Sequence, residues 1–121
     1  MIEVNNLTSV FIDEDDVVHA VDIVLKEEGR EGGFSVAFVE EEEISSLNKS
    51  YRGKNEPTDV LSFSYPGGDI LGEVIVCPAK VVEGNFYRIL VHGVLHALGY
   101  NHGEEMESRE KHLLENKLFK R

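Results

Sequence analysis

The sequence has little cysteine, little proline and no tryptophan: its 121 residues include one cysteine, Cys77, and three prolines. With a single cysteine the chain forms no internal disulfide, which indicates a reducing compartment. It also lacks an apolar run of the ~20 residues that a membrane span needs. Its first residues lack the basic and then apolar pattern of a secretory signal. We therefore expect a soluble protein of the cytoplasm with no membrane partner.

Basic residues are scarce in one part of the chain. Positions 13–43 hold 12 acidic residues against Lys26 and Arg30, a local charge of −10 out of a total of −11. Acidic surfaces are poor non-specific binders of nucleic acid, because they repel its phosphates. We interpret this block as solvated helix surface. Any surface that contacts nucleic acid should therefore be a local patch elsewhere in the chain.

Apolar residues make up 41% of the chain, an ordinary value for a globular protein. A chain of this length fits one domain with one core, so we expect residues 1–121 to form a single domain. Strand-like and helix-like patterns alternate first, and two helices follow at the end. This order predicts an α+β fold in which one mixed sheet of about four strands packs against helices.

The expected elements follow from the spacing of apolar residues and from helix-breaking residues. Strands are predicted at 2–6, 34–39, 60–64 and 70–77, and a turn at 66–69 joins the last two as a hairpin. Helices are predicted from Asp13 to Gly29, around 44–51, at 86–98 and at 104–119. The segment 86–98 is apolar on all sides, so we expect it to be a buried central helix. Its histidines predict that this central helix also binds a metal.

Three of the five histidines fall within 11 residues: His92, His96 and His102. On a helix, residues four apart lie one turn above each other, so His92 and His96 can converge on one ion. Gly99 permits a left-handed turn that ends the helix, and His102 can then arrive as a third ligand. Three imidazoles with an open fourth position are typical of a catalytic zinc site.

The histidine spacing is that of the zinc-protease pattern H-E-x-x-H-x-x-G-x-x-H, with one departure. The glutamate that follows the first histidine in that pattern is Gly93 in this chain. In those proteases the carboxylate takes the proton from zinc-bound water, and glycine has no side chain to do so. The pattern therefore indicates a metal-dependent hydrolase and argues against peptide hydrolysis.

Two motifs of the chain resemble one family. The runs YRGKNEPTDVLSFSYP at 51–66 and HGVLHALGYNH at 92–102 are together similar to the YbeY endoribonucleases, a family of bacterial rRNA maturation factors. The resemblance implies a zinc-dependent endoribonuclease specific for single strands. It also implies action in rRNA maturation, notably at the small-subunit 3′ end, and in ribosome quality control. The implied partners are rRNA, the small ribosomal subunit and ribosomal or assembly proteins.

The family's site residues carry over to matching positions. Its three metal-binding histidines match His92, His96 and His102, which would hold one Zn²⁺ ion, and His92 is expected among the catalytic residues. Its functionally important arginine matches Arg52. A guanidinium binds phosphate oxygens through two hydrogen bonds and keeps its charge. We therefore expect Arg52, in a basic loop, to bind RNA and act in catalysis, with Lys54 as a second phosphate contact.

The chain departs from the family at two places. The segment 78–87 is shorter than expected, and Asn101 stands where Asp is common. If that Asp supports the third histidine, an amide replaces it only in part. Outside the motifs, His19 and His112 each lie alone on an amphipathic helix and are expected at the surface. Thr58 and Asp59 are expected to brace the turn into the following strand.

Two alternative functions stay open from the sequence alone. One is a metallopeptidase-like zinc hydrolase, against which Gly93 argues. The other is a non-catalytic ribosome-assembly factor whose metal only orders the last helices. Three imidazoles would also suit nickel, copper or cobalt, and the sequence identifies no general base.

Overall fold

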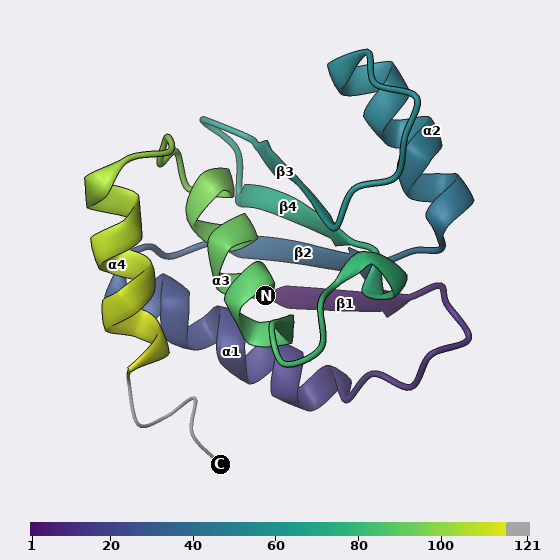
Figure 1. Cartoon of the computed structure of the whole chain (residues 1–121). Coiled ribbons are helices and arrows are strands. Elements are labelled where there is room, and N and C mark those ends of the chain that lie inside the picture. Colours follow the sequence, from purple (N-terminus) through teal and green to yellow (C-terminus); the bar gives the residue numbers. More distant parts are fainter. Residues whose placement is uncertain (116–121) are drawn as a thin grey trace.

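The computed structural model describes residues 1–115, which form one four-stranded sheet and four α-helices (Figure 1). No helix within this range is both long and apolar enough to cross a membrane. In chain order the elements are β1 (Ile2–Asn6), α1 (Glu14–Glu27), β2 (Gly33–Phe38), α2 (Glu41–Arg52), β3 (Val60–Ser64), β4 (Ile70–Val76), the short 3₁₀ helix η1 (Pro78–Lys80), α3 (Phe86–Ala97) and α4 (Glu104–Leu114).

The sheet is mixed, with the strand order β1-β2-β4-β3. β1, β2 and β4 run parallel, whereas β3 pairs antiparallel with β4, starting with Val60 opposite Val76. The amide of Tyr65 donates to the carbonyl of Leu71 at 3.0 Å and closes the β3–β4 hairpin. The predicted α+β class, the mixed sheet of four strands and the hairpin are thus confirmed.

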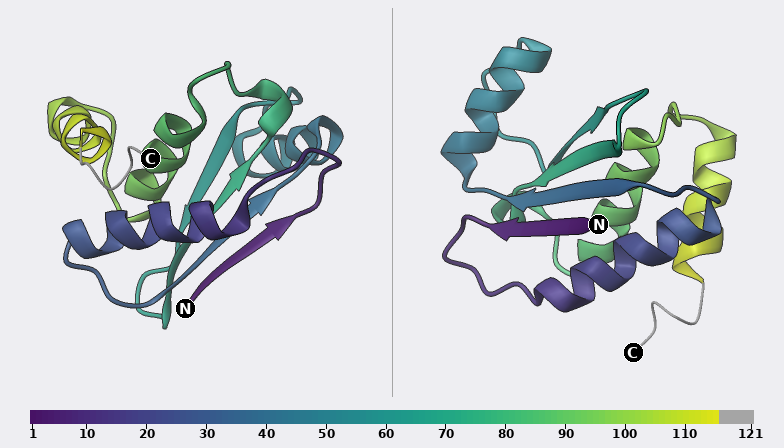
Figure 2. Two further views of the ribbon diagram at one scale, coloured as in Figure 1. Left: turned by 90° about the horizontal axis from the view of Figure 1, so that it is seen from below. Right: turned by 180° about the vertical axis from the view of Figure 1, so that it is seen from behind.

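The two faces of the sheet are covered unequally (Figure 2). α1, α3 and α4 lie on one face, and α2 lies on the other. Within residues 1–115, the face under α1, α3 and α4 carries a continuous core of 17 buried hydrophobic residues. The face under α2 carries a cluster of five: Val39, Ile44, Leu61, Ile75 and Cys77. Since burial of apolar area drives folding, the first face holds the main core, and α3 lies directly on it.

α1 shows how local sequence signals set the ends of a helix. The Asp13 carboxylate accepts a hydrogen bond from the amide of Asp16 at 3.2 Å, as a side chain does at the first position of a helix. At the other end Gly29 has a φ of 65°, in the left-handed region that glycine adopts without strain. The helix therefore begins and ends as the sequence predicts.

Several predicted boundaries differ from the observed ones by one residue. β2 covers Gly33–Phe38, not 34–39; β4 ends at Val76, not at 77; and α3 ends at Ala97, not at 98. The last helix is described as Glu104–Leu114, so its predicted continuation to 119 lies outside the described residues. The helix predicted around 44–51 is longer and covers Glu41–Arg52.

The predicted placement of Arg52 in a loop is wrong, because Arg52 is the last residue of α2. The helix ends at Gly53, whose φ of 70° is left-handed, and the Gly53 amide donates to the carbonyl of Lys49 at 3.0 Å. The buried side chain of Asn48 donates through Nδ2 to the carbonyl of Glu56 at 2.9 Å, which fixes the segment after the helix. Arg52 therefore extends from a defined helix end.

Candidate metal centre

α3 presents two of the three candidate ligands at the border of the main core. Leu90, Val91, Val94 and Leu95 are buried, whereas His92 and His96 are half-buried on the remaining side. The apolar side chains pack α3 against the sheet. Because His92 and His96 are four residues apart on this helix, their imidazoles lie next to each other. Their ring centroids lie 4.7 Å apart.

Gly93 lies where α3 approaches the sheet most closely. A Cβ atom at this position would come within 2.9 Å of side-chain atoms of both Val60 and Val74, a separation that real Cβ atoms do not show. The hydroxyl of Ser62 donates to the carbonyl of Gly93 itself at 2.7 Å, and that of Ser64 donates to the carbonyl of Ala97, one turn further along α3, at 2.6 Å. The residue after the first histidine therefore lacks room for any side chain, including the carboxylate of a peptidase.

The turn after α3 brings the third histidine to the other two. Gly99 has a φ of 109°, and the Tyr100 amide donates back to the carbonyl of Leu95 at 3.1 Å. His102 Nε2 then lies 3.1 Å from His96 Nε2, and the ligand atoms of the three histidines all lie within 4.8 Å of one another. Two nitrogens about 2.0–2.1 Å from one tetrahedral zinc ion are roughly 3.3 Å apart. The donor set thus fits one metal ion.

The other ring nitrogens of the α3 histidines are held by hydrogen-bond acceptors. His92 Nδ1 lies 2.5 Å from Oε1 of Glu110 on α4, and His96 Nδ1 lies 2.9 Å from the carbonyl of Tyr100. Acceptors at Nδ1 keep the proton there and direct the Nε2 lone pair to a metal, and a carboxylate also raises the basicity of its histidine. Glu110 is a site residue that sequence reasoning missed. The sequence suggested carboxylate support only at position 101 and for His102, whereas the Glu110 carboxylate contacts His92.

His96 is electrostatically suited to bind a metal. Burial lowers the pKa of His96 below its ordinary value, and the neighbouring rings of His92 and His102 lower it further, although the Tyr100 carbonyl acts in the opposite direction. A metal binds the neutral imidazole, so protons compete less well for this ring at neutral pH. The site thus favours the form of His96 that can act as a ligand.

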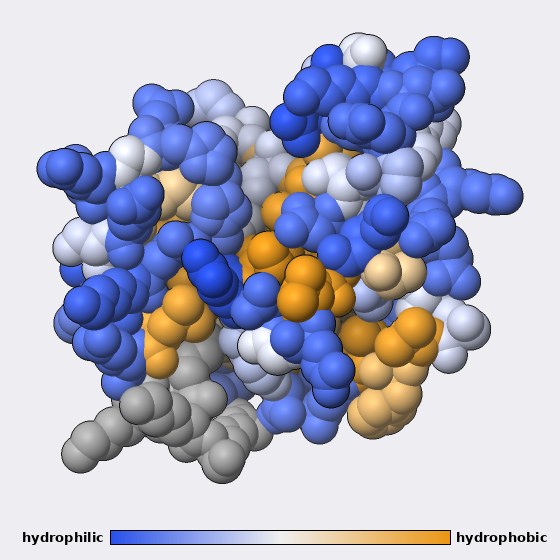
Figure 3. Space-filling model, in the orientation of Figure 1, coloured by the Kyte–Doolittle hydropathy of each residue, from blue (hydrophilic) through white to orange (hydrophobic). Residues whose placement is uncertain are grey.

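Two adjoining grooves meet at the histidines. One has a volume of about 710 Å³ and is bordered by β3, the end of α2 and all three histidines. The other, of about 620 Å³, lies between α3 and α4 and is bordered by Arg88, Lys111 and Glu110. In Figure 3, hydrophilic side chains cover α2 and α4, and hydrophobic residues gather between them. A long substrate could therefore pass the histidines through both grooves.

The structure brings Arg52 but not Lys54 to the histidines. Arg52 is exposed and lines the 710 Å³ groove together with His92, His96 and His102. Lys54 is also exposed, but it is not among the described residues that line either groove. The two basic residues that the sequence places together thus have different surroundings.

The other residues for which the sequence predicted a position, His112, His19 and Asp59, differ in their exposure to solvent. His112 is exposed, as predicted, and lies 3.4 Å from a carboxylate oxygen of Glu27. His19 is half-buried, so its predicted surface placement is only partly correct. Asp59 lies where β3 begins, and its carbonyl accepts from the amide of Cys77 at 2.9 Å. Asp59 also borders both grooves, which its sequence context did not indicate.

The fold and the site together define a class: an α+β domain in which three histidines, on α3 and just after it, could hold one metal ion. The family model for the endoribonuclease YbeY matches residues 3–121. The chain therefore belongs to the YbeY family, and the resemblance inferred from its two motifs is confirmed.

Individual relatives agree with this assignment. An endoribonuclease YbeY from Carboxydothermus hydrogenoformans is 40% identical over 136 residues, which cover 98% of this chain and 95% of the relative. The YbeY endoribonuclease of Legionella pneumophila (strain Corby) is 33% identical over 137 residues, with 98% and 87% covered. A solution structure of a Thermotoga maritima protein matches with a TM-score of 0.65 and 30% identity, over 95% of this chain and 87% of the other.

Proposed function

We propose that this chain is a single-strand-specific, zinc-dependent endoribonuclease. Its role would be rRNA maturation, notably at the small-subunit 3′ end, and ribosome quality control. The whole of residues 1–121 would act as one catalytic domain in the cytoplasm, where ribosomes are assembled. The curated relatives are named endoribonucleases, enzymes that hydrolyse phosphodiester bonds of RNA, and this supports the reaction class.

The observation that carries the proposal is the shared groove of one arginine and three histidines. Arg52 comes from α2, and His92, His96 and His102 come from α3 and the turn after it, yet all four border the same 710 Å³ space. Hydrolysis of a phosphodiester builds negative charge on the phosphate oxygens. A permanently charged guanidinium beside a metal site is suited to bind and stabilise that charge.

Each residue has a distinct task in this proposal. His92, His96 and His102 would hold the zinc ion, while Glu110 and the Tyr100 carbonyl keep two of the rings oriented. A zinc ion so held would supply Lewis-acid activation of water or of a phosphate oxygen. Arg52 would bind the phosphate through two hydrogen bonds and hold it beside the histidines. Lys54, outside the grooves, would contact a neighbouring phosphate of the RNA.

The close approach at Gly93 favours phosphodiester over peptide hydrolysis. A glutamate at this position would have to displace Val60 and Val74 from the core, because even its Cβ lies 2.9 Å from their side chains. The proton acceptor of the zinc peptidases is therefore excluded by packing as well as by sequence. Catalysis in this groove would depend on charge stabilisation at the phosphate.

Two substitutions test the proposal. His96→Ala should release zinc and abolish cleavage of single-stranded RNA, because the site loses one of three ligands. Arg52→Ala should retain zinc and lower the cleavage rate, by roughly 10²-fold if the guanidinium acts like other groups that stabilise developing charge. Lys49→Ala, on the same helix but at a different hollow, should leave both properties unchanged.

A metal assay and digests of RNA and of a peptide library would be run on each purified variant. Cleavage of RNA by metal-free His96→Ala would contradict the proposed metal dependence, and loss of zinc from Arg52→Ala would contradict the role given to Arg52. A fully zinc-loaded wild-type chain that binds ribosomal particles but cleaves no RNA would support a non-catalytic assembly factor instead.

A further inference from the structure

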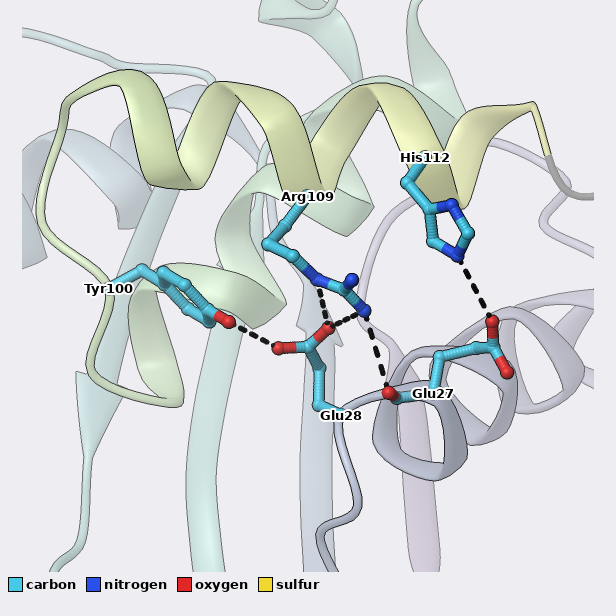
Figure 4. Close-up of polar contacts among 5 residues, drawn as sticks. All are labelled: Glu27, Glu28, Tyr100, Arg109 and His112. Carbon is cyan, nitrogen blue, oxygen red and sulfur yellow. Dashed lines mark hydrogen bonds and ion pairs between the residues drawn. The ribbon is translucent and has the colours of Figure 1, made fainter.

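The carboxylate of Glu28 is buried at the end of α1, where it faces α4 and the turn after α3. The Glu28 side chain is only 7% exposed, although the sequence places it in an acidic block interpreted as solvated surface. Figure 4 shows it between the turn that follows α3 and the middle of α4. The interpretation of the acidic residues in 13–43 as solvated surface is therefore wrong for Glu28. Burial of its carboxylate requires partners that compensate for the lost hydration.

Both oxygens of Glu28 are used by distant segments of the chain. Oε1 accepts a hydrogen bond from the hydroxyl of Tyr100 at 2.5 Å. Oε2 accepts from Nε and Nη2 of Arg109 at 2.8 and 2.5 Å. The guanidinium neutralises the carboxylate, and such charge-assisted bonds are the stronger and more directional kind. One side chain thus fixes α1, the turn after α3 and α4 to one another.

The two residues that Glu28 holds lie next to the acceptors of the histidine rings. Tyr100 itself supplies the carbonyl that accepts from His96 Nδ1 at 2.9 Å. Arg109 directly precedes Glu110, whose carboxylate lies 2.5 Å from His92 Nδ1. A displacement of the turn or of α4 would therefore move an acceptor away from a ligand ring.

We propose that Glu28 is a positioning residue for the metal centre. Through Tyr100 and Arg109 it fixes the two acceptors that orient His92 and His96, so that both Nε2 atoms converge on one ion. The inference rests on the proposed use of these histidines as metal ligands, and it does not depend on the RNA reaction. Glu28 contacts neither ligand, so its effect on the metal is indirect.

A neighbouring ion pair offers a matched comparison. Glu27 lies 3.4 Å from His112 and also joins α1 to α4, but its side chain is 40% exposed and contacts neither acceptor. If Glu28 only tied the two helices together, loss of either carboxylate would change the metal site to a similar, small extent. If Glu28 positions the acceptors, only its loss should change metal binding.

The test compares Glu28→Gln with Glu27→Gln in the full chain. Cobalt is added as the probe metal, its affinity is measured against a competing chelator, and the d–d absorption spectrum reports ligand geometry. Loss of an outer partner of a metal ligand typically weakens binding ~10–100-fold. We expect about tenfold weaker cobalt binding and an altered spectrum for Glu28→Gln, and wild-type values for Glu27→Gln.

Tyr100→Phe provides a second variant in case Glu28→Gln does not fold. It removes only the hydroxyl and keeps the carbonyl, so it should weaken cobalt binding in the same direction and add little to Glu28→Gln in the double variant. Wild-type affinity and spectrum in the folded single variants would overturn the inference. A wild-type chain that binds no cobalt would instead overturn the proposed metal site, and the positioning role with it.

Discussion

The two faces of the sheet contribute unequally to the candidate site. On the face of α1, α3 and α4, 17 of the described residues form the main core, Glu110 lies 2.5 Å from His92 Nδ1, and Glu28 accepts a hydrogen bond from Tyr100. On the face of α2, a cluster of five residues supports the helix that ends in Arg52. The two candidate ligands on α3 thus belong to the most firmly packed part of the molecule, whereas exposed His102 follows in the turn after it. Arg52, the proposed phosphate-binding residue, belongs to a lightly packed part.

From this difference we infer that the histidine site is held rigidly, whereas the side chain of Arg52 can adjust its position. A metal site tolerates little displacement, because its nitrogens must converge within a few tenths of an ångström. A guanidinium that binds phosphate can follow its ligand without loss of charge, so it needs less support. Metal affinity should therefore respond to changes on the first face, whereas changes on the second face should slow RNA cleavage without loss of metal.

The largest effect is expected at the contact between α3 and the sheet. Gly93→Glu would force a Cβ against Val60 and Val74 and bury an unpaired carboxylate. Overpacking costs about 1–3 kcal/mol and a buried charge several more, so we expect a loss of at least about 3 kcal/mol in unfolding free energy. Chemical denaturation would measure it. A stable Gly93→Glu variant would show that α3 can move away from the sheet.

A pair of cavity-forming variants compares the two faces directly. Leu95→Ala on α3 and Ile44→Ala on α2 each remove a buried side chain and should each lower the unfolding free energy by about 2–5 kcal/mol. Leu95→Ala should also weaken metal binding, whereas Ile44→Ala should retain it and slow RNA cleavage. Denaturation, metal titration and an RNA digest would be compared for both. An equal loss of metal affinity in Leu95→Ala and Ile44→Ala would contradict the proposed difference between the two faces.

A smaller effect is expected at the ring of His92. Glu110→Gln keeps an acceptor oxygen but removes the charge 2.5 Å from Nδ1. Metal affinity should fall ~10–100-fold, which is about 1.4–2.7 kcal/mol. A chelator competition at neutral pH would measure this, with exposed Glu107→Gln on the same helix as control. Unchanged affinity would mean that the carboxylate does not support the ligand.

The smallest effect concerns the pH dependence of the metal-free chain. Because burial lowers the pKa of His96 in the folded state, the unfolded chain takes up this proton first as the pH falls. Stability should therefore decrease as the pH drops through about 6.5, the pKa of the unfolded residue, until the folded pKa is reached. Denaturation curves between pH 7.5 and 5, compared with His96→Gln, would isolate this contribution. Identical slopes for the two chains would contradict it.

Local patterns in the sequence predicted most of the fold and the cluster of three histidines that could hold a metal. Asp13 and Gly29 mark the ends of α1, and the spacing of the three histidines needs only a helix and a turn to bring them together. Arg52 could have been assigned to a helix end from Gly53, since glycine commonly follows the last helical residue. The basic, glycine-containing context suggested a loop instead.

The contacts that complete the site could not be predicted, because they join segments far apart in the chain. Glu110 lies 18 residues from His92, and no local pattern separates it from the exposed acids of α4. Glu28 lies 72 residues from Tyr100 and 81 from Arg109. Single-sequence patterns describe faces and ends of elements. Only the contacts that Glu28 makes with α4 and with the turn after α3 show that this carboxylate is buried.

The closeness of the three histidines in the sequence has a consequence for metal-linked folding. Ligands within 11 residues can also meet in the unfolded chain, because a short loop closes at low entropic cost. A metal that binds both states stabilises the folded one only by the difference between two affinities. That difference must come from the helical geometry of α3 and from the two acceptors of its histidine rings, Glu110 and the Tyr100 carbonyl. Excess metal should therefore raise the thermal midpoint by less than the affinity of the folded chain alone would give.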